Sequence, residues 1–333
     1  MSFVRIVPYL QGDKKKLFQL AFNQEGRILR LFRLILAISG IVVTISGCSG
    51  SGEQAGKMET TTSGTIHISA DESFKPVIDS EVQVFESLHP EAHIIVHYKP
   101  EADCLNDLNN DSIRMVIVTR GLTEEERAAL DKKLKFSPRY GPVAFDAIAV
   151  LVNNKSVDTT FTMQDIRSIV KGTSPYKYKL LLDGTTATSN LRFVMDSLLK
   201  GEPLSKNVVA AKSSQEVIDY VSANNDAIGL VGVSWVGDKN DPQALSFLQK
   251  VKIAAIECRD CNGIYVKPYQ ANIAMGRYPM VRPLYYILKE NYDGLGSGFS
   301  NFLIYEKGQL IFRRAYLLPG RMPLDVREME ITE

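Results

Sequence analysis

The stretch "IRMVIVTRGLTEEERAALDKKL" (residues 113–134) sets the fold class. Its first six residues are almost all apolar, which is typical of a strand covered on both faces. Thr123 then precedes an acidic turn and a charged amphipathic segment, so we predict a helix with Thr123 as its N-cap. A buried strand followed at once by a helix is the repeating unit of an α/β protein with a mainly parallel sheet.

The same alternation continues on both sides of this unit. Pro76 lies where a helix tolerates proline, in the first turn of a predicted helix over residues 73–90. The other predicted elements are strands at 64–70, 92–98 and 145–153, a short helix at 101–110, a second strand–helix run over 162–233, a strand at 277–290 and a closing helix with a tail over 298–319. The simplest architecture is two α/β lobes, with the second inserted between two parts of the first.

The N-terminal region predicts export. A basic segment precedes an apolar run at residues 34–45, which is too short for a membrane span of roughly 20 residues but fits the core of a secretion signal. The run ends in "ISGC", which resembles the lipobox of bacterial lipoproteins and implies cleavage before Cys48 and lipidation of its sulfur. We therefore predict a signal peptide over 1–47 and a flexible tether over 48–63. The alternative is a single membrane anchor.

The charge balance excludes a polyanion-binding surface. The formal net charge is +1, of which residues 1–47 contribute +5, so the remainder carries −4. No basic field is therefore available to attract nucleic acid, and an anion must be bound by local groups.

Cysteine and histidine predict neither a metal site nor a cofactor. Cys258 and Cys261 form a lone C-x-x-C, for which a local disulfide or free thiols are favoured over a redox or zinc role. Cys104 has no evident partner. His93 and His97 share one strand face without a supporting carboxylate. No nucleophile–base pair or phosphate-loop fingerprint occurs, so the sequence predicts no enzyme.

Five segments in order resemble the phosphate-binding protein family, the solute receptors of phosphate ABC transporters, across residues 64 to about 320. These segments are "TRGLTEEE" (119–126), "AFDAIAVLVN" (144–153), "NNDAIGLVGVSW" (224–235), "YPMVRPLYY" (278–286) and "FLIYEKGQLIFRRAYLLP" (302–319). The resemblance implies a type II periplasmic-binding-protein fold. Its lobes would comprise 64–150 plus 267–333 and 151–266, with a hinged cleft between them and crossings near 151–153 and 262–266.

The family holds phosphate with hydroxyls and backbone N–H groups at helix N-termini, together with one Arg and one Asp. Carried onto this chain, the resemblance implies a ligand set of Ser73, Phe74, Arg114, Thr119, Asp183, Thr188, Ser189 and Arg192. The family's Asp aligns with Arg114 and its Arg with Asp183, so the two charges are exchanged. We expect Arg114, from the other lobe, to supply the positive charge that the loop after Asp183 lacks.

Each of these residues has a structural alternative. Ser73 and Ser189 suit helix caps, Asp183 suits the turn before Gly184, and Arg114 suits a solvated strand end. Thr185 and Thr186 add hydroxyl donors to the same loop. Arg120 is expected to pair with an acidic neighbour in the following helix, and Arg192 to reach back toward the loop.

The expected function is capture of inorganic phosphate, or of sulfate or molybdate, by a monomeric receptor anchored to the cell envelope through Cys48. The closed receptor would be presented to an ABC-transporter permease. Two other classes stay open: a sensor or scaffold that kept the fold but lost anion binding, motivated by Asp71 and Glu72, and a hydrolase, for which no catalytic pair is found.

Overall fold

The computed structural model describes residues 59–184, 188–237 and 247–322. Its strands are β1 (Gly64–Asp71), β2 (Ala92–Lys99), β3 (Ile113–Val118), β4 (Arg139–Asn153), β5 (Thr160–Phe161), β6 (Lys179–Asp183), β7 (Val208–Ala211), β8 (Ala227–Gly232), β9 (Val251–Ile253), β10 (Ala255–Glu257), β11 (Tyr265–Val266), β12 (Val281–Leu288) and β13 (Leu318–Pro319). Its helices include α2 (Lys75–Leu88), α3 (Glu101–Asn106), α4 (Glu124–Leu134), α5 (Met163–Lys171), α6 (Ser189–Phe193), α7 (Ser214–Ala223), α9 (Gln270–Ala274), α10 (Leu295–Ile304) and α11 (Glu306–Arg314).

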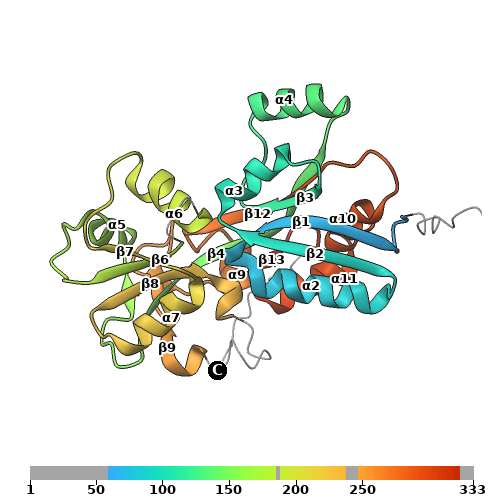
Figure 1. The fold of residues 1–333 in the computed structure, drawn as a ribbon. Helices are drawn as coiled ribbons and strands as arrows, with labels where there is room; N and C mark the ends of the chain where they lie inside the picture. Colours follow the sequence, from blue (N-terminus) through green and yellow to red (C-terminus); the bar gives the residue numbers. More distant parts are fainter. Residues whose placement is uncertain (1–58, 185–187, 238–246, 323–333) are drawn as a thin grey trace, which may run out of the picture. The chain divides into compact units, whose positions relative to one another are not determined.

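In the described residues, most of these strands belong to one curled sheet, and β11, β10 and β5 form a separate three-stranded sheet. The main path of the large sheet is β2-β1-β3-β12-β4-β8-β6-β7, with β9 and β13 also paired to β4 (Figure 1). Strand β1 is parallel to β2 and β3, and β6 is parallel to β7 and β8, whereas β4 and β12 run antiparallel to their neighbours. The predicted α/β fold is therefore confirmed, and its sheet is mixed: the parallel triplets β2-β1-β3 and β8-β6-β7 are joined through the antiparallel strands β12 and β4.

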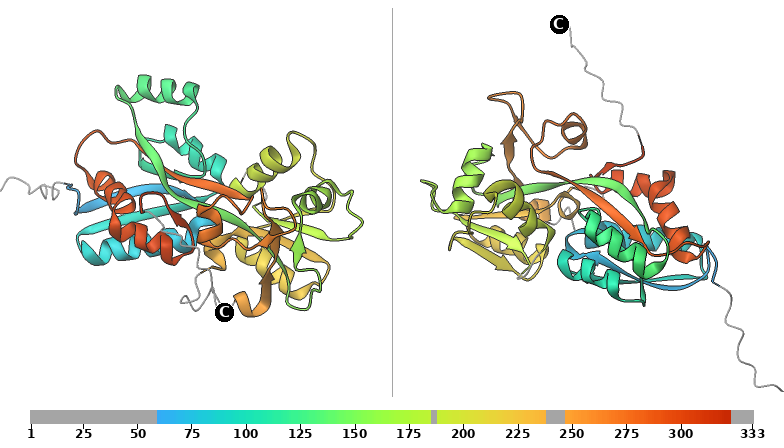
Figure 2. Two further views of the ribbon diagram at one scale, coloured as in Figure 1. Left: turned by 180° about the vertical axis from the view of Figure 1, so that it is seen from behind. Right: turned by 90° about the horizontal axis from the view of Figure 1, so that it is seen from above.

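Strand β4 belongs to both halves of the sheet. Its residues 139–147 pair with β12, and residues 148–152 pair with β8 (Figure 2). Residues 151–153, where the sequence predicts a crossing between lobes, lie inside this strand. The predicted lobe boundaries and hinges stay a prediction.

Separate hydrophobic cores flank the two halves. The core around β1 and β3 is closed by α2, α10 and α11, with the rings of Phe85 and Phe299 packed edge to face. The core around β6 and β8 contains Ile148, Leu230 and Tyr278, whose hydroxyl donates to the carbonyl of Ile148. Both cores are filled by the apolar strands that the sequence predicts.

Local capping rules place the helices accurately. Thr123 caps α4 in a reciprocal capping box with Glu126, and Pro76 lies in the first turn of α2, so both predictions are confirmed. The predicted short helix at 101–110 and the helix after Ser189 are also present, the latter as α6 continued by a π-helical turn at Val194–Leu199.

The predicted closing helix is wrong in one respect, because it is two helices. α10 ends before Tyr305, whose ψ of 176° breaks the helical path, and α11 then begins. A Cβ at Gly308 would lie 2.3 Å from the carbonyl oxygen of Phe302, so this close approach requires glycine. The helical spacing of apolar residues continues through this break, so periodicity alone predicts a single helix.

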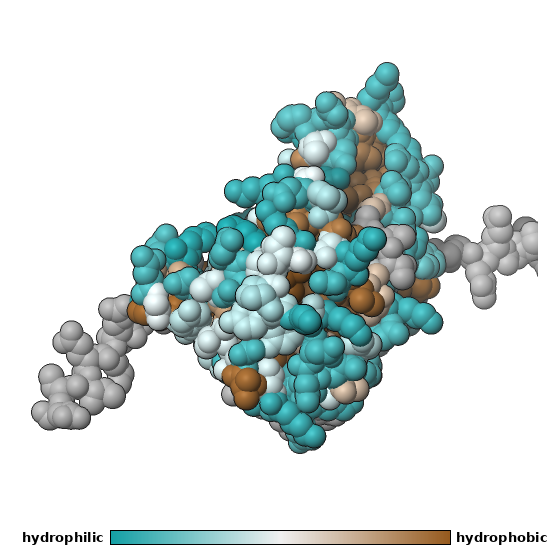
Figure 3. Space-filling view, turned by 90° about the vertical axis from the view of Figure 1, so that its left-hand side faces the viewer, coloured by the Kyte–Doolittle hydropathy of each residue, from teal (hydrophilic) through white to brown (hydrophobic). Residues whose placement is uncertain are grey.

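The surface of the half that carries α5–α7 is mainly hydrophilic, with scattered hydrophobic residues (Figure 3). Among the described residues, no helix is both long and apolar enough to cross a bilayer. The last five residues of the predicted tether, 59–63, are described; there Glu59 forms an ion pair with Arg114.

Candidate functional site

A buried polar cluster lies at the carboxyl end of β6. The carboxylate of Asp183 accepts hydrogen bonds from Ser73 Oγ at 3.1 Å, Ser214 Oγ at 2.5 Å and Asn190 Nδ2 at 2.6 Å. Ser214 begins α7 and Asn190 lies in α6, so two helix starts supply donors to one carboxylate. Asp183 is fully buried, and these three bonds satisfy a charge that would otherwise be costly there.

Arg282 brings a guanidinium to the same cluster. Its Nη1 donates to Ser189 Oγ at 2.7 Å, and the Ser189 hydroxyl lies 3.5 Å from that of Ser73. The guanidinium also lies over the Phe74 ring, 4.9 Å from its centroid. At 3% exposure, this cation is almost completely removed from water.

Asp146 balances Arg282 from the neighbouring strand. The two residues are register partners on β4 and β12. Asp146 Oδ2 accepts a hydrogen bond from Arg282 Nε at 3.0 Å and lies 2.8 Å from Nη2 in the same ion pair. Burial raises the pKa of Asp146, whereas Arg282 lowers it. A Cβ at Gly232 would lie 3.1 Å from Asp146 Oδ2, so glycine leaves room for the pair on the adjoining strand.

A second set of donors surrounds Glu101, the first residue of α3. Its Oε1 accepts from the backbone N–H of Thr119 at 2.7 Å and from Thr119 Oγ1 at 2.6 Å. Arg192 donates from Nε to Glu101 Oε2 at 2.5 Å and from Nη2 to Thr119 Oγ1 at 2.7 Å. Burial raises the pKa of Glu101, but Arg192 and Thr119 together lower it below its usual value.

Two further carboxyl groups lie beside these donors. Asp71 is fully buried and accepts from the backbone N–H of Ser73 at 2.9 Å. Burial raises the pKa of Asp71 to about 6, although Arg282 opposes the shift. Burial, with Asp183 and Asp71 nearby, raises the pKa of Glu72 to about 7. The cluster therefore places several buried carboxyl groups beside the Arg282 guanidinium.

The structure brings together seven of the eight predicted site residues. Ser73, Phe74, Asp183 and Ser189 belong to the Arg282 cluster; Thr119 and Arg192 belong to the Glu101 set. Thr188 lies beside Asp183 in the Arg282 cluster. It is the N-cap of α6, accepting from the Leu191 N–H and donating to the Asp183 carbonyl. Ser189 is thus not the cap that its structural alternative assumes.

Arg114 is the exception, and the structure corrects its predicted role. It forms ion pairs with Glu59 and Glu290 and donates to the Tyr292 hydroxyl, away from Asp183. Arg114 is near the start of β3 and Thr119 follows its end, and five residues of strand span roughly 16 Å. The positive charge beside Ser189 comes from Arg282 instead.

Sequence reasoning missed Arg282, Asp146 and Glu101. The first two stand inside "YPMVRPLYY" and "AFDAIAVLVN", each a lone charge in an apolar strand. Isolated charges in buried strands need partners, so this pattern could have predicted the pair. Glu101 follows Pro100 at the start of a short helix, where an acidic residue is ordinary, and gives no such signal.

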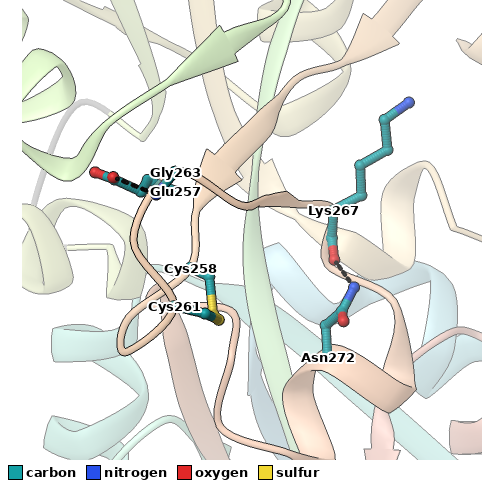
Figure 4. The surroundings of a disulfide bond; sticks show 6 residues. All are labelled: Glu257, Cys258, Cys261, Gly263, Lys267 and Asn272. Carbon is teal, nitrogen blue, oxygen red and sulfur yellow. Dashed lines mark hydrogen bonds between the residues drawn. A yellow bond between two sulfur atoms is a disulfide. The ribbon is translucent and has the colours of Figure 1, made fainter. Parts of the chain in front are cut away.

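Other predictions have clear outcomes. Arg120 pairs with Glu126, as expected. Cys258 and Cys261 form a local disulfide, one of the two alternatives that the sequence favours, and the loop that it closes is braced by the Gly263 N–H, which donates to Glu257 (Figure 4). Among the described residues Cys104 is a buried free thiol, and no group of three or more metal-ligating side chains occurs there.

Three predicted features lie outside the described residues. These are the lipidated Cys48, the signal segment 1–47, and the loop hydroxyls of Thr185 and Thr186.

Comparison with known proteins agrees with this fold. A family model described as a PBP superfamily domain matches residues 55–307. The phosphate-binding protein PstS of Pseudomonas aeruginosa is 22% identical over 296 residues, covering 81% of this chain and 87% of its own. PstS of Bacillus subtilis is 22% identical over 314 residues, covering 90% and 95%.

Solved structures share the architecture. A Clostridium perfringens protein, described as a phosphate ABC transporter substrate-binding protein with bound phosphate, has a TM-score of 0.63 at 20% identity and covers 77% of this chain and 99% of its own. An ABC-type phosphate transport receptor from Vibrio cholerae has a TM-score of 0.56 at 19% identity, with 77% and 100% covered. These likenesses show the fold, which is of the type II periplasmic-binding-protein kind. The chain therefore belongs to the PBP superfamily, and its resemblance to the phosphate-binding protein family is confirmed.

Proposed function

We propose that this chain is an extracytoplasmic solute-binding protein, anchored by a lipid on Cys48, that captures inorganic phosphate or a similar oxyanion for an ABC transporter. It acts as a monomer that presents its ligand to a membrane permease. Its role is binding rather than catalysis, and no covalent step is involved. The relatives that carry phosphate-binding names support this assignment.

One observation carries the proposal: a buried guanidinium and two hydroxyls converge from distant segments. Arg282 Nη1, Ser189 Oγ and Ser73 Oγ form one chain of polar contacts. A planar guanidinium grips an oxyanion through charge-assisted hydrogen bonds, and hydroxyls add neutral donors at little electrostatic cost. An oxyanion inserted among these groups would replace their mutual contacts with contacts to itself.

Calorimetry on the full chain in detergent micelles tests the proposal. Titration with phosphate, sulfate and molybdate should give saturable heat with phosphate or another of these oxyanions. Ser189→Ala should weaken binding at least tenfold, because it removes the hydroxyl between Arg282 and Ser73. Ser300→Ala, at a buried serine of α10, is the matched control and should leave affinity unchanged. If no anion gives binding heat, the proposal that this chain is a receptor is contradicted.

The lipid anchor has its own test. The full chain expressed in a bacterium fed labelled palmitate should incorporate the label, and Cys48→Ala should not. Cys104→Ala should retain it, since Cys104 is buried in the folded part. Equal labelling of the Cys48 variant would contradict the anchor.

A second function, a sensor or scaffold without anion binding, is favoured by the acidic side chains. Asp71, Asp146, Asp183 and Glu101 are all buried beside the two guanidiniums of Arg192 and Arg282. A further anion in this surrounding would meet like charges at close range. The same titration separates the two functions, because only a receptor gives saturable binding.

A further inference from the structure

The Glu101 carboxylate is held as a bound anion would be. Both oxygens are engaged, Oε1 by the backbone N–H and hydroxyl of Thr119, and Oε2 by Nε of Arg192. The side chain is 2% exposed. A backbone N–H, a hydroxyl and a guanidinium are also the donors that bind an oxyanion in a protein site.

The contact joins two segments that lie far apart in the sequence. Glu101 begins α3, and Arg192 lies on α6, 91 residues further along the chain. Arg192 is one helical turn beyond Ser189, whose hydroxyl accepts from Arg282. The Glu101 set and the Arg282 cluster are therefore adjoining parts of one polar region, and Glu101 is close enough to Asp71 for its charge to raise the pKa of that group.

We propose that Glu101 is a built-in competitor: its carboxylate occupies the donors of Thr119 and Arg192, and an oxyanion reaches these donors only by displacing it. This inference rests on the proposed function, because a competitor has a role only if the chain binds an oxyanion. Glu101 thereby sets the affinity of the site and excludes anions too dilute to compete.

Two physical points support displacement rather than joint occupancy. Thr119 offers one N–H and one hydroxyl, and both point to Glu101 Oε1, so they cannot serve a second anion at full strength. A carboxylate left beside a bound oxyanion would also repel it in this poorly solvated region. The Arg192 side chain is 33% exposed, so the incoming anion can reach this donor from solvent before the exchange.

The test compares Glu101→Gln with wild type by calorimetric titration of the full chain with inorganic phosphate. Glutamine keeps the shape and removes the charge, so phosphate should bind at least tenfold more tightly. Glu101→Ala, which empties the position, should shift affinity in the same direction and serves if the glutamine variant does not fold. Structural damage alone would weaken binding, so a gain in affinity is specific to competition.

Asp196→Asn is the matched control. Asp196 Oδ2 lies 3.6 Å from Nη1 of the same Arg192, but its side chain is 65% exposed, and Thr119 is not among its contacts. Removing its charge should change phosphate affinity less than threefold.

Each outcome decides between the two ideas. Tighter binding in the Glu101 variants but not in Asp196→Asn supports the competitor. Unchanged or weaker binding in the Glu101 variants overturns it, while wild-type binding would leave the proposed function standing. If only the Glu101 variants bind phosphate, the result supports competition by Glu101 and contradicts phosphate capture by the wild-type chain. No binding in any protein overturns both.

Discussion

Asp71 places a titrating carboxyl group inside the cluster. Burial raises its pKa from 3.8 to about 6, so the native state resists its ionisation. The stability that protonated Asp71 contributes is complete below about pH 4 and is lost as the pH rises through 6. A shift of this size corresponds to roughly 3 kcal/mol.

Asp71→Asn should therefore remove a pH-dependent loss of stability. Between pH 4.5 and 7.5, the free energy of unfolding should fall by about 2 kcal/mol more in wild type than in the variant. Urea unfolding at the two pH values measures the difference, and Asp196→Asn, at an exposed carboxylate, is the control. Identical pH slopes for wild type and Asp71→Asn would show that this group is not the source.

The Arg282–Asp146 pair gives a second prediction at this scale. Arg282→Met leaves Asp146 buried without its partner, and such losses cost about 3–5 kcal/mol. The double variant Arg282→Met/Asp146→Asn should recover much of that cost, because the uncompensated charge is gone. Urea unfolding of the four proteins completes the double-mutant cycle. A double variant as unstable as the sum of the singles would contradict the coupling.

At the scale of elements, α6 depends on its cap. Thr188→Ala removes the acceptor of the Leu191 N–H and should cost about 1 kcal/mol of stability. It should also weaken phosphate binding, since α6 carries Ser189 and Arg192.

Thr123→Ala is the matched control. It removes an equivalent cap from α4 and should cost about as much stability with no loss of binding. Urea unfolding and calorimetry together measure both effects; equal binding in the two variants would contradict the positioning role of α6.

The elements were predictable wherever local chemistry decides them. Pro76 and Thr123 mark helix starts through bonds to neighbours in sequence, and the apolar run over 113–118 predicts a buried strand. The Arg282–Asp146 pair joins residues 136 positions apart, and only strand register brings them together. The role predicted for Arg114 was wrong for a related reason. Aligning motifs does not show which end of a strand lies at the site, and Arg114 lies near the start of β3, whereas Thr119 follows its end.

At the scale of the whole molecule, we expect cooperative unfolding, because β4 belongs to both halves of the sheet. Trp235, the only tryptophan of the chain, donates from its indole N–H to the carbonyl of Ser73 at 2.8 Å. Its fluorescence thus senses a contact between segments 162 residues apart. Because β4 belongs to both halves, unfolding in urea should give the same midpoint by tryptophan fluorescence and by far-UV circular dichroism. Two separated midpoints would mean that the halves unfold independently.

Strand β4 also has a mechanical consequence. Its fifteen residues extend roughly 50 Å and are hydrogen-bonded to β12 along one part and to β8 along the next. Because β4 is continuous across both halves, any rotation of one half relative to the other must bend or twist this strand. We expect such a rotation to be limited in angle, since a large one would break the hydrogen bonds that β4 makes with β12 and β8.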